Sequence, residues 1–158
     1  MSTCLPIQRV LYVEDHPVNV LLMQALFDRR PRARLCVAAT AADGLAQALE
    51  ETPDLLLLDL RLPDCHGTEL LQRMRGHASL AAVPAIAVTA EDTGDLSGRG
   101  FAETWHKPMD LHFTLTRLDR WLERAARRVV QCAKAVAPEP AWATGRAPRP
   151  IPFPTAAP

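Results

Sequence analysis

Residues 55–59 read Leu-Leu-Leu-Leu-Asp, a short apolar run that ends in a carboxylate and follows the turn residues Pro53 and Asp54. The run is apolar on both faces, which is typical of a strand in the middle of a sheet covered on both sides. Around it, short apolar runs alternate with segments whose apolar residues recur at helical spacing, which predicts βαβ units and a parallel sheet. The other strands are expected at about residues 9–14, 34–38, 84–89 and 103–106.

Three helices are predicted from the spacing of apolar residues, which places one apolar face of each helix against the sheet. The first begins near Pro17, a residue that the first turn of a helix tolerates, and the others span about residues 41–51 and 67–75. The side chains expected to face the sheet are Val18, Leu21, Leu22 and Ala25 in the first helix, Ala41, Leu45 and Leu49 in the second, and Leu70, Leu71 and Met74 in the third.

The chain between residues 91 and 100 contains Gly94, Gly98 and Gly100. Glycine costs about 1 kcal/mol in a helix interior, so any helix there should be short and weak. A last helix is expected to begin near Asp110, with its first half covering the sheet and its second half projecting past it. Its apolar residues keep a heptad-like spacing and are Leu111, Leu115, Leu118, Leu122, Ala125, Val129, Cys132 and Val136.

Four parts are predicted along the chain: an N-terminal lead at 1–7, a folded domain at 8–124, a helix extension at 125–136 and a tail at 137–158. Half of the fourteen prolines lie in the last twenty-one residues, and such a stretch favours extended polyproline conformers over a helix or a strand ladder. We therefore expect a disordered tail. It is most simply a linker remnant, and a polyproline ligand for a partner is the alternative.

The composition excludes several classes of protein. Eighteen basic and eighteen acidic residues give zero formal net charge, without the basic excess expected of a nucleic-acid-binding protein. The four cysteines have no Cys-x-x-Cys spacing, so we expect reduced thiols in a cytoplasmic protein, and we do not interpret Cys65-His66 as a metal site. The first residues lack the features of a signal peptide, and no apolar run approaches the roughly 20 residues of a membrane span.

Reactive side chains stand where four of the predicted strands end. Asp59 closes the 55–59 run, Glu14 and Asp15 follow the first strand, Thr89 ends the fourth and Lys107 follows the fifth. In a parallel sheet these ends share one edge, and ligands of open α/β sheets bind beyond that edge. We therefore expect three carboxylates, one hydroxyl and one ammonium to meet in one crevice.

The crowding of these carboxylates indicates a cation. Two carboxylates about 4 Å apart repel by roughly 4 kcal/mol at an effective dielectric near 20, and Lys107 offers only partial relief. Mg²⁺ prefers one or two carboxylates together with waters and phosphate oxygens. An anionic group on Asp59 would complete the shell of the metal, meet Lys107 as counter-ion and accept the hydroxyl of Thr89. The pattern is typical of a site that makes and breaks an aspartyl-phosphate.

Residues 8–124 resemble the receiver domain of two-component response regulators. The resemblance implies a flavodoxin-like, doubly wound sheet of five parallel strands in the order 2-1-3-4-5. It also implies that Asp59 accepts phosphate from a histidine kinase or a histidine phosphotransfer protein, and the segment 14–19 is most similar to the receivers of hybrid sensor kinases. The motifs that carry the resemblance are Val13-Glu14-Asp15, Leu58-Asp59-Leu60-Arg61-Leu62-Pro63 with Gly67, Val88-Thr89-Ala90 and Lys107-Pro108.

The same resemblance implies a role for each residue of the site. Asp15 and Asp59 would ligate Mg²⁺, Glu14 would act largely through water, and Arg61 would supply its backbone carbonyl. The catalytic residues would be Asp59, Thr89 and Lys107: the hydroxyl of Thr89 and the amide of Ala90 would hold the phosphoryl oxygens, Lys107 would form the ion pair, and the Lys107-Pro108 bond would be cis.

Two features depart from the family. Thr104 stands where the family usually carries an aromatic switch residue, with Trp105 one place later, and the segment between Thr89 and Lys107 is shorter than usual by about one helical turn. The phosphorylation chemistry lies outside both changes, whereas the output surface lies within them. We expect phosphorylation to move this segment little, or by another route.

The expected function is a phosphoacceptor receiver without an enzymatic or DNA-binding output domain, which signals by protein contact. One alternative is an interaction module that works without phosphorylation. Another is a small phosphohydrolase with Asp59 as nucleophile, which is disfavoured because Arg61 stands where that class needs an acid/base aspartate. Residues 123–136 are expected to pack against a second copy or a partner helix.

Overall fold

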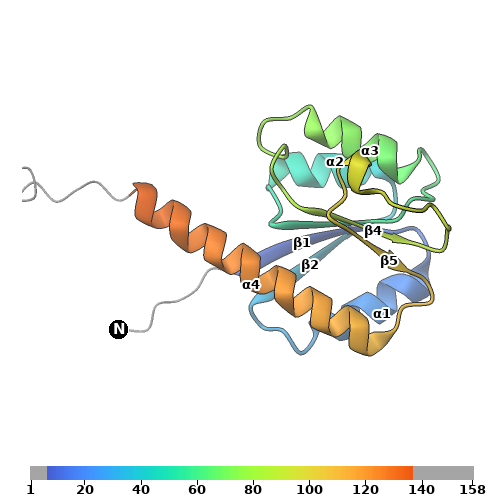
Figure 1. The fold of residues 1–158 in the computed structure, drawn as a ribbon, viewed down its shortest axis with the longest axis horizontal. Coiled ribbons are helices and arrows are strands. Elements are labelled where there is room, and N and C mark those ends of the chain that lie inside the picture. Colours follow the sequence, from blue (N-terminus) through green and yellow to red (C-terminus); the bar gives the residue numbers. More distant parts are fainter. Residues whose placement is uncertain (1–6, 137–158) are drawn as a thin grey trace, which may run out of the picture.

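The structure, a computed structural model, describes residues 7–136, except for the side chains of residues 130 and 132–136. Five parallel strands form one sheet in the order β2-β1-β3-β4-β5, as predicted (Figure 1). Residues 1–6 of the predicted lead and the tail predicted at 137–158 lie outside the described residues. The strands are β1 (Gln8–Val13), β2 (Ala33–Ala38), β3 (Leu55–Leu58), β4 (Ala85–Thr89) and β5 (Glu103–His106).

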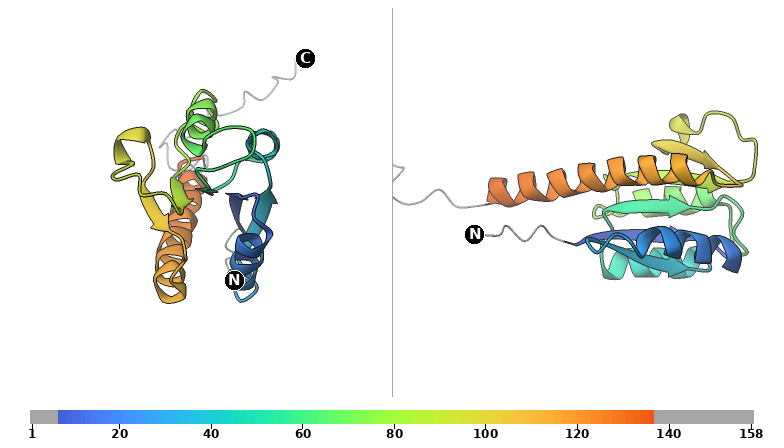
Figure 2. Two further views of the ribbon diagram at one scale, coloured as in Figure 1. Left: turned by 90° about the vertical axis from the view of Figure 1, so that its right-hand side faces the viewer. Right: turned by 90° about the horizontal axis from the view of Figure 1, so that it is seen from below.

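Helices cover both faces of the sheet, α2 and α3 on one side and α1 and α4 on the other (Figures 1 and 2). Between β4 and β5 the described chain forms only the short 3-10 turn η1 (Ser97–Arg99), as expected for a glycine-rich segment. Gly94 and Gly100 there adopt φ values of +63° and +90°, which favour glycine. The α-helices are α1 (Pro17–Phe27), α2 (Ala41–Glu50), α3 (Gly67–Arg75) and α4 (Leu111–Val136).

The central strand β3 joins the two cores, because its successive side chains point to opposite faces. Leu56 and Leu58 pack among the residues of α2 and α3, whereas Leu55 and Leu57 pack among those of α1 and α4. None of the four is more than 1% exposed, and fully burying one such side chain contributes about 1.5–3 kcal/mol. The buried strand therefore fixes the position of Asp59, the residue that directly follows it, at the carboxyl edge of the sheet.

The predicted buried face of α1 is wrong. Val18 and Leu21 are 63% and 65% exposed, Ala25 is exposed and Leu22 is half-buried, whereas Met23, Leu26 and Phe27 face the core. The helix is apolar almost all round, so the spacing of apolar residues alone did not determine its rotation. A polar contact does: the Asn19 side chain donates to Glu14 Oε1 at 3.1 Å, which turns Met23 and Phe27 inward with it.

The predicted face of α2 is correct for Ala41, partly correct for the half-buried Leu45 and wrong for Leu49, which is 44% exposed. Gly44 and Ala48 are buried in its place. A Cβ atom at Gly44 would lie 2.7 Å from Val13 Cγ2, so the helix approaches β1 closely only because this residue is a glycine. Small residues thus form the contact face, and the larger leucine turns away.

Helix α4 begins at Leu111, capped by Asp110, whose Oδ1 accepts a hydrogen bond from Phe113 N at 2.7 Å. Leu118 and Leu122 are buried as predicted, but Leu111 is 50% exposed because it lies in the first turn, beyond the sheet. Ala125 lies in the half of the helix that was expected to project past the sheet, yet it is 5% exposed, beside the loops at 52–54 and 79–84. None of the helices described is long and apolar enough to cross a membrane.

Candidate functional site

The carboxyl ends of the strands bring the predicted reactive residues to one edge of the sheet, which faces the viewer in the left panel of Figure 2. Glu14, Asp15 and Asp59 each offer a carboxylate oxygen, and these three atoms lie within 4.8 Å of one another. Glu14 and Asp59 are buried and Asp15 is exposed. Thr89 ends β4 fully buried, and Lys107 follows β5 at the same edge.

The Lys107 ammonium joins two of the carboxylates. Its Nζ lies 2.5 Å from Glu14 Oε2 and 2.7 Å from Asp59 Oδ2, and the Lys107 side chain is only 13% exposed. Its backbone N–H donates to the carbonyl of Thr89 at 2.8 Å, and the Lys107-Pro108 bond is cis, as predicted. With one ammonium among three carboxylates, the site keeps an excess of negative charge.

Glu14 is the most heavily hydrogen-bonded carboxylate of the site. Besides Lys107 it accepts the Tyr12 hydroxyl at 2.8 Å, the Asn19 amide at 3.1 Å and the His16 backbone N–H at 3.2 Å. Burial would raise the pKa of Glu14, but the hydrogen bonds from Lys107, Asn19 and Tyr12 outweigh it and hold this pKa below its usual range. Glu14 is therefore held in its charged form.

For Asp59 the effects of burial and hydrogen bonding on the pKa give the opposite result. Burial raises its pKa above the usual range and the charge of Glu14 adds to this, although Lys107 and the Arg61 backbone N–H, which donates to Asp59 Oδ1 at 3.1 Å, work against it. Ionisation of the Asp59 carboxylate therefore costs free energy in this site. Binding of a cation to the carboxylate, or a covalent bond formed by one of its oxygens, would remove that cost.

Tyr12 and Asn19 were not predicted from the sequence as parts of the site. Burial, and then the charge of Glu14, raise the pKa of the Tyr12 hydroxyl, so Tyr12 acts as a hydrogen-bond donor to Glu14. A phenol between the apolar residues Leu11 and Val13 was the one available signal, because a buried tyrosine hydroxyl needs a partner. Asn19 gave no comparable signal, since its contact depends on how α1 is rotated.

A third missed residue, Glu91, connects the two loops beside Asp59. The Arg61 side chain, 76% exposed, donates to Glu91 Oε1 at 2.6 Å, and His66 Nε2 lies 3.5 Å from Glu91 Oε2. The backbone N–H of Glu91 donates to the Thr89 hydroxyl oxygen at 3.0 Å. The hydrogen bond from Arg61 lowers the pKa of Glu91. The role predicted for the Arg61 carbonyl, as a metal ligand, stays a prediction.

The loop after Asp59 is held by a glycine and an aspartate. A Cβ atom at Gly67 would lie 2.2 Å from the Asp59 carbonyl oxygen, so only glycine lets α3 begin directly against the site. Asp64 accepts the backbone N–H groups of Ala41 and Ala42 at 2.8 and 2.9 Å, which lowers the pKa of Asp64 and caps α2 from another loop. The loop is thus fixed at both ends.

The donor set fits the metal that was predicted. Glu14, Asp15 and Asp59 offer only carboxylate oxygens, which suit hard ions such as Mg²⁺ rather than soft transition metals. The exposure of Asp15 leaves room for the waters that Mg²⁺ retains. The three residues would supply the protein side of the ion's shell.

The chain has a flavodoxin-like sheet, and the carboxyl edge of this sheet carries an acidic pocket in which one lysine contacts two carboxylates. These features together define a class of α/β signalling domains. The chain belongs to the response regulator receiver domain family, whose model matches residues 10–133. This match extends past residue 124, where the sequence placed the domain boundary. It agrees with the burial of Ala125 against the body of the domain.

Individual relatives agree with this assignment. The chain is 29% identical over 106 residues to Protein PilH of Pseudomonas aeruginosa, which is 65% of this chain and 87% of PilH. It is 31% identical over 135 residues to the DNA-binding dual master transcriptional regulator RpaA of Synechocystis sp., which is 80% of this chain but 53% of RpaA, so it spans about half of that relative.

A solved structure agrees in fold as well. The receiver domain of the sensor histidine kinase PA1611 from Pseudomonas aeruginosa is 28% identical, with a TM-score of 0.64 over 75% of this chain and 97% of that one. That structure has a magnesium ion coordinated in its active site cleft.

Proposed function

We propose that this receiver domain accepts a phosphoryl group on Asp59 from a phosphohistidine, on a histidine kinase or a histidine phosphotransfer protein, in a Mg²⁺-dependent reaction in the cytoplasm. A carboxylate oxygen of Asp59 forms the bond to phosphorus, the phosphorus–nitrogen bond to the histidine breaks, and the released imidazole takes up a proton. The observation that carries the proposal is the Lys107 ammonium shared by Glu14 and Asp59.

The residues of the site have separate tasks in this reaction. Asp59 is the nucleophile, and its bond to phosphorus would place the negative charge on the phosphoryl oxygens, which carry more charge than the carboxylate did. Lys107 would pair with the phosphoryl oxygens after transfer, because its Nζ already contacts Oδ2 of Asp59 and an ammonium also forms charge-assisted hydrogen bonds with phosphate. The Thr89 hydroxyl accepts the Glu91 N–H and keeps its own hydrogen for donation to the phosphoryl group.

Glu14, Asp15 and Asp59, with the Arg61 carbonyl, would hold the ion. When bound, Mg²⁺ neutralises charge between the carboxylates and the incoming phosphoryl oxygens, as it does in phosphoryl transfer generally. Glu14 stays ionised beside it because Tyr12, Asn19 and Lys107 all donate to it. The free thiols of Cys36 and Cys65 fit the cytoplasmic location.

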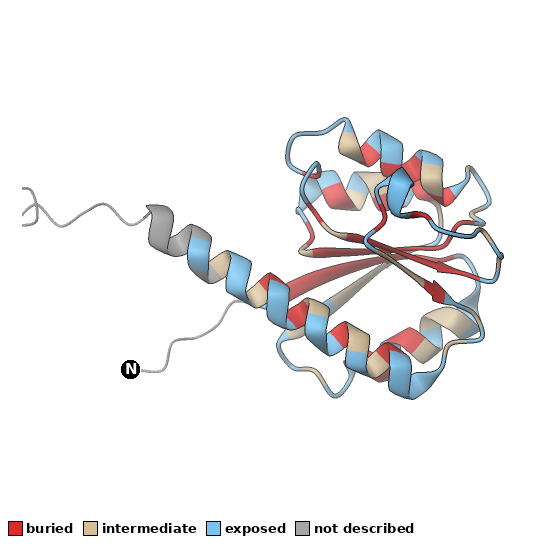
Figure 3. Ribbon diagram, viewed as in Figure 1, coloured by how far each residue is buried: buried red, intermediate tan, exposed pale blue. Residues whose placement is uncertain are grey.

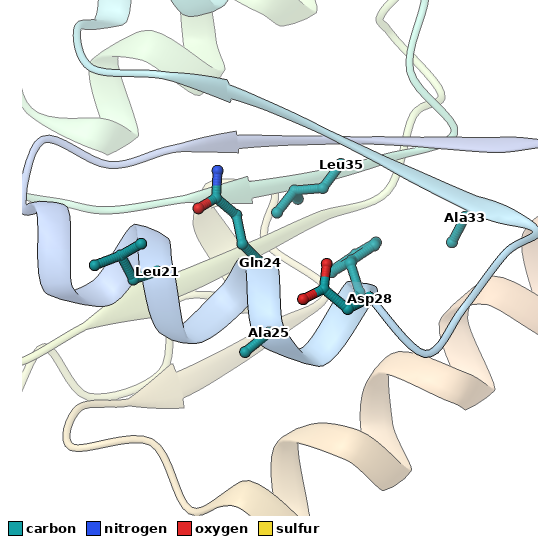
Figure 4. A pocket seen from close by; sticks show the side chains of 7 residues that line it. Leu21, Gln24, Ala25, Asp28, Ala33 and Leu35 are labelled. Carbon is teal, nitrogen blue, oxygen red and sulfur yellow. The ribbon is translucent and has the colours of Figure 1, made fainter.

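Exposed apolar side chains suggest where the phosphohistidine protein docks. Among the described residues, four of six large hydrophobic side chains that are exposed lie near the starts of α1 and α4, at the edge that carries the site: Val18, Leu21, Leu111 and Phe113, with exposed fractions of 46–65%. Figure 4 shows Leu21 at one end of a hollow between α1 and β2, which extends to Asp28 and Ala33 at the amino edge of the sheet. A donor helix packed on the four exposed side chains at the carboxyl edge would bring its histidine toward Asp59.

The proposal is tested by incubating the protein with phosphoramidate and Mg²⁺ and detecting the adduct by mass spectrometry. A phosphoryl adduct should form on the wild type, and it should be lost with a chelator and in Asp59→Asn. An unlabelled but folded wild type would instead favour the interaction module that works without phosphorylation. That second candidate is favoured by one observation, the reduction of the segment between β4 and β5 to the turn η1.

A further inference from the structure

The second half of α4 forms a surface at the opposite end of the molecule from Asp59. The helix starts at the carboxyl edge of the sheet, crosses its length and continues past the amino edge (Figure 2, right). Ala125 is buried where α4 crosses the loops at 52–54 and 79–84. Beyond that point the described side chains are mostly exposed (Figure 3).

A hollow of about 350 Å³ lies along this part of α4. Its floor is formed by Pro84, the half-buried Trp121 and Ala125, and we call it the α4 hollow. Because Ala125 is small, the helix leaves this space open where a leucine in the same position would fill it. The arginines around the floor are Arg124, Arg127 and Arg128.

The α4 hollow is lined by three arginines that form no ion pair within residues 7–136. Arg124, Arg127 and Arg128 are exposed, and none is within ion-pair distance of a described carboxylate. Within the described residues, two of these arginines contact uncharged groups. The Arg124 guanidinium lies 5.0 Å from the Trp121 ring, and Arg128 Nη1 donates to the Ala82 carbonyl at 3.2 Å. Six other described arginines pair with carboxylates, as Arg30 does with Asp119, whereas Arg29, Arg32, Arg75, Arg99 and Arg120 do not.

We propose that the α4 hollow binds an acidic segment of a partner protein, with one apolar side chain seated over Trp121 and Pro84 and carboxylates facing Arg124, Arg127 and Arg128. Tryptophan and arginine are the residues that most often dominate binding energy at protein interfaces. Desolvated arginines prefer carboxylates, with which they form two parallel hydrogen bonds.

Charge and shape decide against other occupants. A second copy docked through the same surface would bring two clusters of arginines together, which is unfavourable. A lipid surface would be met by protruding apolar side chains, whereas here Pro84, Trp121 and Ala125 line a hollow. The expected partner is therefore an acidic peptide or helix.

The test uses the full chain and synthetic peptides of twelve residues made of Asp and Glu around a central Leu, Phe or Trp, each matched by a peptide with central Ser. Calorimetric titration should show binding of at least one apolar-centred peptide, weakened about tenfold or more in Arg124→Glu/Arg127→Glu and in the milder Arg124→Gln/Arg127→Gln. The matched control is Arg29→Glu/Arg99→Glu, which reverses two exposed arginines elsewhere and should bind as wild type does.

The following results would overturn the proposal. One is that no peptide binds. Another is that the Ser-centred peptides bind equally well, which would show that charge alone, without an apolar side chain, accounts for binding. Equal loss in the Arg29/Arg99 control would show that the site is elsewhere. Binding to phosphatidylserine vesicles that depends on Arg124 and Arg127, without peptide binding, would assign the surface to lipid. Sedimentation as a dimer that the same substitutions abolish would assign it to a second copy.

Discussion

At the residue scale, Asp59 and Glu14 share one ammonium, yet their pKa values are shifted in opposite directions. Hydrogen bonds from Lys107, Asn19 and Tyr12 lower the pKa of Glu14, while burial and the charge of Glu14 raise that of Asp59. Glu14 therefore contributes stability that is present above its unfolded pKa and is lost as the pH falls through its lower folded pKa. Asp59 does the reverse, since its ionisation lowers stability as the pH rises through its raised pKa.

Asp59→Asn should consequently raise the melting temperature at neutral pH without Mg²⁺. The amide removes an ionised group that the buried site disfavours, and the gain should shrink as the pH falls through the raised pKa of Asp59, where the wild-type carboxyl becomes neutral as well. Thermal melting between about pH 3 and 8 measures both. Asp92→Asn changes an exposed carboxylate and should show no such gain. A stabilisation of Asp59→Asn that did not depend on pH would contradict this account.

Gly67→Ala should destabilise the protein and slow the labelling of Asp59. The new Cβ would stand 2.2 Å from the Asp59 carbonyl oxygen, so the loop must shift, and overpacking of this kind costs about 1–3 kcal/mol. Denaturant unfolding gives the loss of stability, and mass spectrometry gives the rate of phosphoramidate labelling. Gly98→Ala meets no atom within 4 Å and should leave both unchanged. If the two variants behaved alike, the close approach at Gly67 would be irrelevant.

At the scale of elements, α1 presents to solvent the residues that its sequence pattern assigns to the core. A contiguous exposed apolar patch usually marks a contact, and Val18 and Leu21 lie three residues apart on α1, one turn from each other. Val18→Ser/Leu21→Ser should therefore slow phosphoryl transfer from a histidine phosphotransfer protein about tenfold or more, while labelling by phosphoramidate stays at the wild-type rate. Because both residues are more than 60% exposed, stability should change little.

Transfer kinetics from a phosphorylated donor protein, run beside phosphoramidate labelling, separate docking from chemistry. Leu49→Ser is the matched control, since Leu49 is also exposed but lies on α2, on the other face of the sheet. Unchanged transfer in the α1 variant, or an equal decrease in Leu49→Ser, would show that the donor uses another surface.

Strands and their ends could be predicted from the sequence, whereas rotations and partners could not. A strand such as β3 is a contiguous apolar run, and in a parallel sheet all runs end at the same edge. The positions of Asp59, Thr89 and Lys107 at this edge could therefore be predicted from the order of residues along the chain. The rotation of α1 depends on Asn19 reaching Glu14, and the approach of α2 depends on the absence of a side chain at Gly44. Neither contact leaves a periodic signal in the sequence.

At the scale of the whole molecule, the site and the region between β4 and β5 are joined through Glu91 rather than through an aromatic residue on β5. Thr104 has no ring to swing behind Thr89, and the segment contains only the turn η1. Beryllofluoride with Mg²⁺, which mimics the phosphoryl group, should therefore not order residues 91–104 strongly. Hydrogen exchange followed by mass spectrometry measures this directly, and strong new protection across 91–104 would refute the expectation.

Helix α4 also has a mechanical consequence. It is one unbroken rod from Leu111, four residues after Lys107, to Val136 beyond the far edge of the sheet. At 1.5 Å per residue such a rod is about 39 Å long. A tilt of about 5° at its first turn would sweep its far end through about 3 Å, a lever arm that magnifies sub-ångström adjustments near Lys107 into displacements that a neighbouring molecule can sense.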